Sequence, residues 1–340
     1  MEFSMNTNFH SSRVAAVQAS PIYMDLNASI DKAIDLITEA AKNGARLVAF
    51  PENFLPGYPW FVWLGTPAWA MQFMNDYHKQ ALIVGSEQYQ RLEKAASDNQ
   101  IQVVMGFTEK DNGSLYMSQA IIDENGKTLA TRRKLKPTLA ERLVFGEGDG
   151  SDIAVHDTSI GKLGALCCWE HIQPLTKFAM YSQHEQIHVA AWPGFSLYTE
   201  VTPAIGGEVN TAVSRTYAVE GQCYVIAPCA IVSQDTIDFL CSSDEQRELL
   251  KTGGGFTRIY GPDGASLVHP LNEDEEGILY ADIHLDAITI AKVAGDPVGH
   301  YSRNDVTRLI FNNQSLRPVQ RNEVPLFDNG IIISSEDEEA

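Results

Sequence analysis

The chain has 340 residues, 44% of them hydrophobic and 20% charged, a composition typical of a folded protein with a large core. Its net charge of −19 argues against nucleic acid or an anionic membrane as partner, and no apolar run is long enough to span a bilayer. The five cysteines are odd in number and form no CxxC pair, so we expect reduced thiols in a cytoplasmic protein.

Apolar runs of strand length alternate with stretches of helical periodicity along the chain. In chain order the expected elements are a strand at 14–19, a helix at 30–41, strands at 46–50 and 102–108 separated by a helix at 87–99, a hairpin of 115–122 and 127–133, strands at 153–155 and 163–168, a helix at 174–183, a strand at 187–192, a helix at 208–220, a strand at 223–227, a helix at 236–250, and strands at 256–260, 266–268 and 277–283. The strand–helix–strand order at the start predicts an α/β fold with parallel pairing. Residues 54–63 form an aromatic-rich loop that we expect at a pocket or a subunit contact.

No linker or change of composition interrupts the middle of the chain, which predicts one domain over residues 13–303. Residues 1–12 are expected to be a flexible N-terminal segment. Residues 304–340 are expected to be a C-terminal extension, and its acidic end, 334–340, has the composition of a disordered tail.

Three residues that can perform chemistry lie at the C-terminal ends of predicted strands: Glu52, Lys134 and Cys168. Ligands of α/β sheets gather where strands end, and a carboxylate, an ammonium and a thiol meeting there could act as base, charge stabiliser and nucleophile. A following helix would favour the Cys168 thiolate. Each residue also has a structural interpretation. Glu52 could cap a helix, Lys134 could be one of several solvated charges, and Cys167 and Cys168 could both be small buried hydrophobes, so the two interpretations of this cysteine pair stand even.

Two histidine patterns raise the question of other chemistry, namely zinc binding or a cysteine–histidine pair. His184 and His188 form an HExxH string, which binds zinc when it lies on one helix. Here a strand follows at once, so we expect the helix to end near His184 and the imidazoles to be separated; a zinc peptidase is a remote alternative and we expect no metal. His171 could pair with Cys168, but across a strand-to-helix turn their side chains need not meet, so we interpret it as a supporting residue.

Eight stretches resemble, in order, those of nitrilases of the carbon–nitrogen hydrolase superfamily, and they cover most of residues 13–303. They are Phe50–Pro59, Arg133–Thr138, Glu141–Arg142, Gly146–Gly150, Cys168–His171, Val189–Pro193, Tyr217–Gly221 and Asp296–Ser302. Within that superfamily the stretches 131–138 and 155–183 look most like arylacetonitrilases and aliphatic nitrilases.

The resemblance implies a catalytic triad in which Glu52 is the general base, Lys134 stabilises the transition state and Cys168 is the nucleophile. Cys168 is preferred to Cys167 because the family nucleophile directly precedes Trp-Glu-His, and Glu141 matches a further carboxylate that assists. Side chains expected in the substrate pocket or supporting it are Tyr58, Trp60, Trp169, His171, Trp192 and Pro193.

The same resemblance implies a four-layer αββα sandwich, assembled as a dimer and as larger spiral homo-oligomers. The implied reaction converts a small organic nitrile to the carboxylic acid and ammonia through a covalent thioimidate and thioester. No cofactor is expected, because the thiolate supplies the nucleophile. A cyanide dihydratase, an amidase or carbamoylase of the same superfamily, and a non-catalytic protein that keeps the fold are the alternatives.

Overall fold

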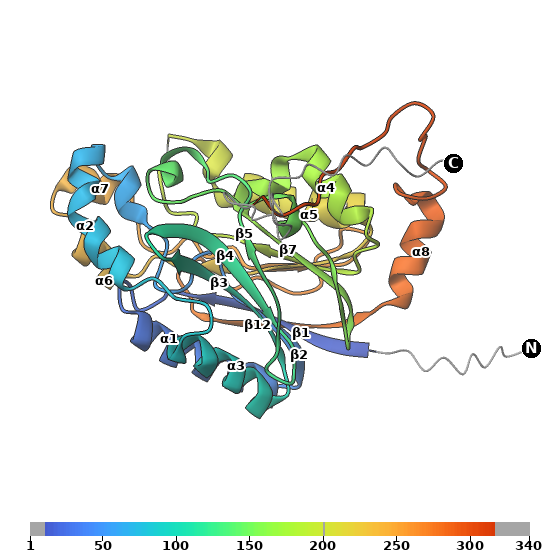
Figure 1. Cartoon of the computed structure of the whole chain (residues 1–340), viewed down its shortest axis with the longest axis horizontal. Helices are drawn as coiled ribbons and strands as arrows, with labels where there is room; N and C mark the ends of the chain where they lie inside the picture. The colour runs from blue at the N-terminus through green and yellow to red at the C-terminus, as the bar shows by residue number, and fades with distance from the viewer. Residues whose placement is uncertain (1–10, 200, 317–340) are drawn as a thin grey trace, which may run out of the picture.

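The computed structural model describes residues 11–199 and 201–316, and two β-sheets form its centre (Figure 1). The first sheet contains β1 (Ser11–Ala19), β2 (Ala45–Ala49), β3 (Gln102–Asp111), β4 (Ser114–Ile122), β5 (Thr128–Arg133), β10 (Cys229–Ala230) and β12 (Gly277–His284). The second sheet contains β6 (His156–Thr158), β7 (Gly161–Cys167), β8 (Ile187–Ala191), β9 (Tyr224–Ala227) and β11 (Arg258–Tyr260).

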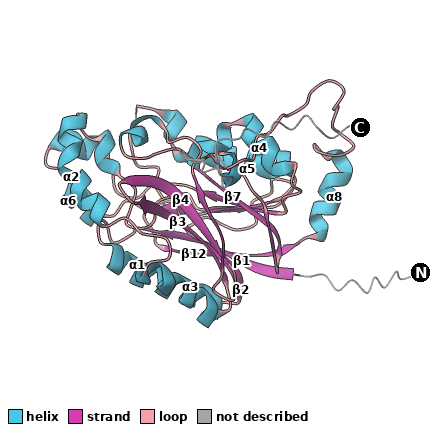
Figure 2. Cartoon of the chain, viewed as in Figure 1, coloured by secondary structure: helices cyan, strands magenta, loops and turns pink. Residues whose placement is uncertain are grey.

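Helices lie on the outer faces of both sheets and at the ends of the sandwich (Figure 2). They are α1 (Leu26–Lys42), α2 (Pro67–Lys79), α3 (Glu87–Asn99), α4 (Pro174–Tyr181), α5 (Gly207–Gly221), α6 (Gln234–Leu240), α7 (Asp244–Leu249) and α8 (Asp286–Gly295). Short 3₁₀ turns lie at Trp60–Trp63, Leu139–Leu143, Gly150–Asp152, Cys168–Ile172 and Pro203–Ile205.

Three apolar cores lie between four layers. One core joins α1 and α3 to the outer face of the first sheet, for example through Ile30, Leu92 and Val48. The next lies between the sheets, where Leu47 of β2 belongs to the same cluster as Val189 of β8. The third packs the other face of the second sheet against α4 and α5. The predicted αββα sandwich is therefore confirmed, and the alternation of side chains along each strand explains how one strand supplies two cores.

Parallel pairing brings several strand ends to one region. In the first sheet β1, β2 and β3 are parallel, and β4 and β5 continue it antiparallel, so that β5 runs the same way as β3. In the second sheet β7, β8 and β9 are parallel. A hydrogen bond from the Glu52 backbone N–H to the Trp192 carbonyl, 3.3 Å, ties the end of β2 to the end of β8.

Some element boundaries differ from those expected. The strand expected at 153–155 lies instead at His156–Thr158, because residues 150–152 form a 3₁₀ turn that ends in Ile153. The single helix expected over 236–250 is two helices, since Ser243 accepts a hydrogen bond from the Gln246 N–H and starts α7 afresh. Helices α2 and α8 were not predicted, although Thr66 caps α2 and Pro67 occupies its first turn.

The first strand begins at Ser11, which pairs with His284 of β12, so the strand reaches two residues into the segment expected to be flexible. Beyond residue 303 the chain continues to contact the domain. Leu309 packs against the core between the second sheet and helices α4 and α5, and the Leu316 N–H donates to Asp149. Residues 1–10 and the acidic tail at 334–340 lie outside the described residues. None of the helices within 11–199 and 201–316 combines the length and apolarity that crossing a membrane requires.

Candidate active site

A fully buried ammonium lies between two buried carboxylates at the ends of the strands. Lys134 follows β5, and its Nζ donates to Glu52 Oε1 and to Glu141 Oε2, each at 2.8 Å. Glu52 follows β2, and Glu141 belongs to the 3₁₀ turn Leu139–Leu143. Removing such charges from water is costly unless each one is paired. The structure therefore brings two predicted residues, Glu52 and Lys134, into direct contact and adds Glu141.

The charges of this group do not cancel, because two carboxylates share one ammonium. Burial is the main reason that the pKa of Glu52 rises to about 8, and the nearby charge of Glu141 adds to the rise although Lys134 opposes it. Burial also disfavours the charged form of Lys134, but the two carboxylates outweigh it and raise the pKa of this ammonium well above its usual value. Lys134 therefore stays protonated at neutral pH, while Glu52 can gain or lose a proton there.

Glu52 keeps one oxygen free. Its Oε2 is buried and has no hydrogen-bond partner among the described residues. An unpaired buried carboxylate oxygen is unfavourable in a purely structural site. It is, however, what a carboxylate needs if it is to take a proton from a neighbouring group.

Cys168 directly follows β7 and has a left-handed backbone, with a φ of 46°. Cys168 is buried, with 8% of the residue's surface exposed. Burial and then the charge of Glu52 raise the pKa of the Cys168 thiol well above its usual value, and Lys134 opposes this without reversing it. The expected thiolate favoured by a helix end is therefore wrong for the resting protein, because Cys168 opens only a short 3₁₀ turn and its negative neighbours disfavour a second anion.

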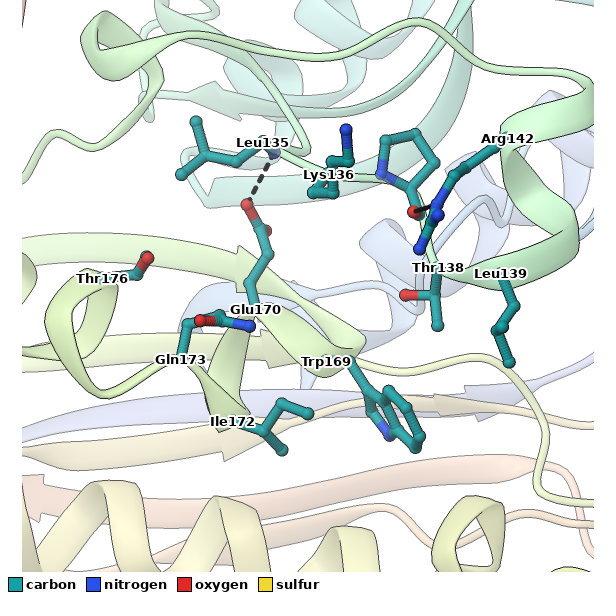
Figure 3. Close-up of a pocket in the computed structure, with 11 residues that line it drawn as sticks. Leu135, Lys136, Thr138, Leu139, Arg142, Trp169, Glu170, Ile172, Gln173 and Thr176 are labelled. Carbon is teal, nitrogen blue, oxygen red and sulfur yellow. Dashed lines mark hydrogen bonds between the residues drawn. The ribbon is translucent and has the colours of Figure 1, made fainter.

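Cys168 and Glu141 line the same cavity, which has a volume of about 50 Å³. Its other walls are largely apolar and aromatic: Tyr58, Trp60, Trp63, Thr138, Leu139, Trp169, Pro193, Gly194, Phe195, Leu197, Ile205 and Asn210. A larger open groove of about 550 Å³ lies next to it, shown in Figure 3, and shares Thr138, Leu139 and Trp169 with the cavity. These three residues therefore lie where the cavity and the outer groove adjoin.

The aromatic loop holds Glu141 in place. The Tyr58 hydroxyl donates to Glu141 Oε1 at 2.6 Å, and the Trp63 indole N–H donates to the Tyr58 oxygen at 3.2 Å. The Thr138 backbone N–H donates to Glu141 Oε2 at 2.5 Å. Glu141 is thus fixed by three donors, counting Lys134, and has little freedom to move.

A second buried ion pair joins the strand ends that carry Lys134 and Cys168. Glu170 Oε1 accepts from Arg132 Nη2 at 2.7 Å and from the Leu135 N–H at 2.9 Å, the latter drawn in Figure 3. Its Oε2 accepts from the Cys167 N–H at 2.7 Å. Although burial opposes ionisation, Arg132 outweighs it and lowers the pKa of Glu170. One carboxylate therefore links the residue before Cys168 to the residue after Lys134.

Sequence comparisons place the chain among known proteins. The family described as carbon-nitrogen hydrolase matches residues 13–292. A nitrilase of Pseudomonas syringae pv. syringae is 58% identical over 300 residues, covering 88% of this chain and 89% of the relative. An aliphatic nitrilase of Rhodococcus rhodochrous is 54% identical over 90% of this chain and 84% of the relative. An arylacetone-specific nitrilase of Alcaligenes faecalis is 47% identical over 91% and 87%.

The chain belongs to the carbon–nitrogen hydrolase family. Its predicted resemblance to the nitrilase branch is confirmed by these relatives. Solved structures agree on the fold of this carbon–nitrogen hydrolase. The C. elegans NitFhit protein matches with a TM-score of 0.69 at 20% identity, over 91% of this chain and 69% of its own. An amidase from Nesterenkonia sp. matches with a TM-score of 0.60 at 21% identity, over 83% and 94%.

Of the residues predicted for the pocket of this carbon–nitrogen hydrolase, some line the cavity and others are buried behind it. Tyr58, Trp60, Trp169 and Pro193 line the cavity beside Cys168. His171 and Trp192 are buried and stacked on each other, with ring centroids 5.3 Å apart, and they do not line it. His171 contacts the Cys168 backbone carbonyl, as a supporting residue would.

The HExxH string does not form a helical metal site. Helix α4 ends at Tyr181, His184 is exposed with a left-handed backbone, and His188 is fully buried within β8. In the described part of the chain no group of three His, Cys, Asp or Glu side chains is placed to hold a metal ion.

Sequence reasoning did not single out three residues that shape the site. Arg132 and Glu170 are 38 positions apart, and their ion pair leaves no local signal. Asn210 of α5 accepts a hydrogen bond from the Trp169 indole N–H at 3.1 Å and orients that cavity wall. A charged residue inside a predicted strand, as Arg132 is, was the one available sign of a buried partner.

Proposed function

We propose that this protein hydrolyses small organic nitriles to the carboxylic acid and ammonia, with Cys168 as nucleophile, Glu52 as general base and Lys134 as the group that stabilises negative charge. The observation that carries the proposal is the fully buried Lys134 held between Glu52 and Glu141, because Glu141 lines the same small cavity as Cys168. The names of the relatives, nitrilase and aliphatic nitrilase, supply the substrate class.

The first half of the reaction forms a covalent intermediate. Glu52 takes the thiol proton as the Cys168 sulfur attacks the nitrile carbon, and the C≡N bond becomes C=N. Glu52 then gives this proton to the nitrogen, which produces a thioimidate and leaves Glu52 ionised for the next step. Lys134 is suited to stabilise the charge that develops on nitrogen, because a buried ammonium acts through a medium of low dielectric constant.

The second half of the reaction consumes two water molecules. Glu52 removes a proton from the first water as it adds to the thioimidate carbon, and the resulting tetrahedral species expels ammonia to leave a thioester. A second water then releases the carboxylic acid and restores the thiol. If the tetrahedral species expels the thiol instead, the product is an amide. Glu141 assists by keeping Lys134 charged and in position.

The raised pKa of the thiol fits a nucleophile that is formed only during attack. A resting thiolate would stand beside two carboxylates, which burial and repulsion both disfavour. Transfer to Glu52, whose pKa is raised to about 8, lets the proton leave as the carbon–sulfur bond forms. The best base for this step has a pKa near the working pH, which Glu52 satisfies.

The small aromatic cavity supports an uncharged substrate whose nitrile group reaches Cys168 while its remaining carbons contact aromatic walls. The relatives include an aliphatic nitrilase and an arylacetone-specific nitrilase. A panel of aliphatic nitriles, arylacetonitriles, the matching amides and cyanide, with ammonia as the readout, distinguishes nitrilase activity from amidase and cyanide dihydratase activities.

The decisive experiment compares two neighbouring cysteines on that panel. Cys168→Ala is expected to abolish ammonia release, since no thiol remains at the cavity. Cys167→Ala is the matched control, because Cys167 is buried and does not line the cavity, and it should keep much of the activity. Loss of activity in Cys167→Ala with retention in Cys168→Ala would overturn the assignment of the nucleophile.

The proposal extends to assembly and location. Self-association as a dimer and larger spiral oligomers is supported by apolar side chains exposed on α8, where Ile290 is 76% and Val293 75% exposed. Light scattering coupled to gel filtration tests it, and a monomer at micromolar concentration would contradict it. A reducing, cytoplasmic setting is supported by the five free cysteines.

A further inference from the structure

Behind Cys168 runs a chain of four buried polar side chains that the reaction above does not use. His171 Nδ1 contacts the Cys168 carbonyl oxygen at 2.6 Å, and His171 Nε2 contacts His188 Nε2 at 2.8 Å. His188 Nδ1 contacts Glu185 Oε1 at 2.7 Å, and the Tyr217 hydroxyl donates to Glu185 Oε2 at 2.6 Å. All four residues are at most 1% exposed.

The carbonyl fixes the direction of the first hydrogen bond. Because a carbonyl oxygen only accepts, His171 Nδ1 carries a hydrogen. The contact between the two imidazoles and the contact between His188 and Glu185 then hold one hydrogen each. Three arrangements satisfy this condition. Either Glu185 is protonated and both imidazoles are neutral, or Glu185 is ionised and the positive charge lies on His188 or on His171. The number of protons is the same in all three, and only the position of the charge differs.

The surroundings favour the uncharged arrangement. Burial raises the pKa of Glu185 to about 8, although the Tyr217 hydroxyl opposes this rise. Burial lowers the pKa of both imidazoles well below the usual value. Of the charged groups that face them, Arg132 acts in the same direction and Glu170 opposes it. The hydrogen bonds therefore run from Tyr217 to one oxygen of protonated Glu185, from its other oxygen to His188, then to His171 and to the Cys168 carbonyl.

Packing holds this chain in one geometry. The rings of His188 and Tyr217 stack with centroids 3.8 Å apart, and His171 stacks on Trp192. Gly164 of β7 makes room for the carboxyl, since a Cβ at this position would lie 2.0 Å from Glu185 Oε1. Side chains locked on both sides have little rotamer freedom.

The hydrogen-bonded series of side chains ends at the Cys168 carbonyl, and the backbone conformation of Cys168 is one that its surroundings must stabilise. Cys168 has a φ of 46°, which a residue with a Cβ rarely adopts, and such a conformation persists where the surrounding structure fixes it. The His171 hydrogen bond is attached to the carbonyl of this residue. Movement of that carbonyl would redirect the Cα–Cβ bond and so move the sulfur.

We propose that Tyr217, Glu185, His188 and His171 form an uncharged, hydrogen-bonded positioning chain that fixes the carbonyl of Cys168 and thereby aims its sulfur into the cavity. The proposal rests on the proposed role of Cys168 as nucleophile. Glu185, His188 and Tyr217 touch neither substrate nor reacting atoms, so they are positioning residues, and their effect falls on the rate of attack and not on substrate binding.

Two substitutions at one position test the chain. Glu185→Gln preserves every contact, because its amide N–H donates to His188 and its oxygen accepts from Tyr217. It should keep kcat within about threefold of the unmodified enzyme. Glu185→Leu has a similar volume but leaves His188 Nδ1 without a donor. It should lower kcat by at least about tenfold while KM changes by less than about threefold.

Alkylation of Cys168 by iodoacetamide, followed by mass spectrometry of the labelled peptide, separates this proposal from the proposed function. The alkylation rate should fall in Glu185→Leu and recover in Glu185→Gln, whether or not a nitrile is a substrate. If the unmodified enzyme hydrolyses no nitrile but the alkylation rates follow this order, the proposed function fails and the positioning chain stands.

Three results would overturn the proposal of a positioning chain. The first is an unchanged kcat and alkylation rate in Glu185→Leu. The second is an equal defect in Glu185→Gln, which would require an ionised carboxylate. The third is a ¹⁵N spectrum of labelled histidine at pH 7 in which His171 or His188, identified with His171→Asn and His188→Gln variants, is charged. The expected spectrum shows neutral rings, protonated at Nδ1 in His171 and at Nε2 in His188.

Discussion

Replacing Glu170 by glutamine should reveal how strongly the buried ion pair holds together the strand ends that carry Lys134 and Cys168. An amide has a single acceptor oxygen, whereas Glu170 accepts from Arg132, from the Leu135 N–H and from the Cys167 N–H with its two oxygens. In Glu170→Gln the amide nitrogen must therefore face at least one donor, and the Arg132 charge loses its partner. Breaking a buried pair on one side costs about 3–5 kcal/mol.

The free energy of unfolding, measured by urea titration at pH 7 with circular dichroism, provides the test, and we expect Glu170→Gln to lower it by about 3–5 kcal/mol. A matched surface variant is Asp98→Asn, which breaks the exposed pair with Lys94 on α3 and should change stability by less than about 1 kcal/mol. The double variant Arg132→Met/Glu170→Gln should lose less than the sum of its single variants, since no isolated charge remains. A loss below about 1 kcal/mol for Glu170→Gln, or strict additivity in the double variant, would refute the reasoning.

Three further predictions concern the buried side chains of Lys134 and Glu52. Lys134→Met leaves Glu52 and Glu141 without a counter-ion, so one carboxyl should stay protonated. Ammonia release in steady-state assays should therefore fall by at least about 10²–10³-fold, while circular dichroism shows that the fold is retained. Activity within about tenfold of the unmodified enzyme would exclude the proposed role of Lys134. Because Glu52 must be ionised to act as base and its pKa is raised to about 8, the rate at low substrate should rise with pH up to about 8 and then level off, and a profile flat from pH 6 to 9 would contradict this. The same shift makes the folded state hold a proton that the unfolded chain has lost, so stability should fall as pH rises between about 4.5 and about 8, a slope that Glu52→Gln should reduce.

The positions of Glu52, Lys134 and Cys168 were predictable because local patterns mark the ends of their strands. Pro51 follows β2, and a run of apolar residues ends at Cys167 in β7. The direct contact of Lys134 with both carboxylates could not be predicted from these patterns. It depends on how β2, β5 and the turn that carries Glu141 are brought together by the first sheet, and such long-range packing leaves no periodic trace in the sequence.

The HExxH string shows why a motif needs its structural context. The string was correctly separated from a zinc helix, because the apolar run after His188 predicted a strand, and His188 does lie in β8. The hydrogen-bond partners of His188 could not be predicted in this way, because Glu185 lies inside the string whereas His171 lies 17 residues earlier in the sequence. The break between α6 and α7 was missed for a different reason: Ser243 is a capping residue whose short-range signal was overlooked within an apparently continuous helical pattern.

The charge of the site constrains both substrate and product. With Glu52 ionised, Glu52, Glu141 and Lys134 carry a net charge of one negative unit, and Glu141 lines the largely apolar cavity that also contains Cys168. An anionic substrate would have to approach this buried negative charge, and a neutral nitrile avoids that repulsion. Hydrolysis then converts the neutral substrate to a carboxylate. The same repulsion that excludes anions from binding would therefore speed the departure of the product, and added carboxylic acid should be a weak inhibitor compared with the corresponding neutral amide.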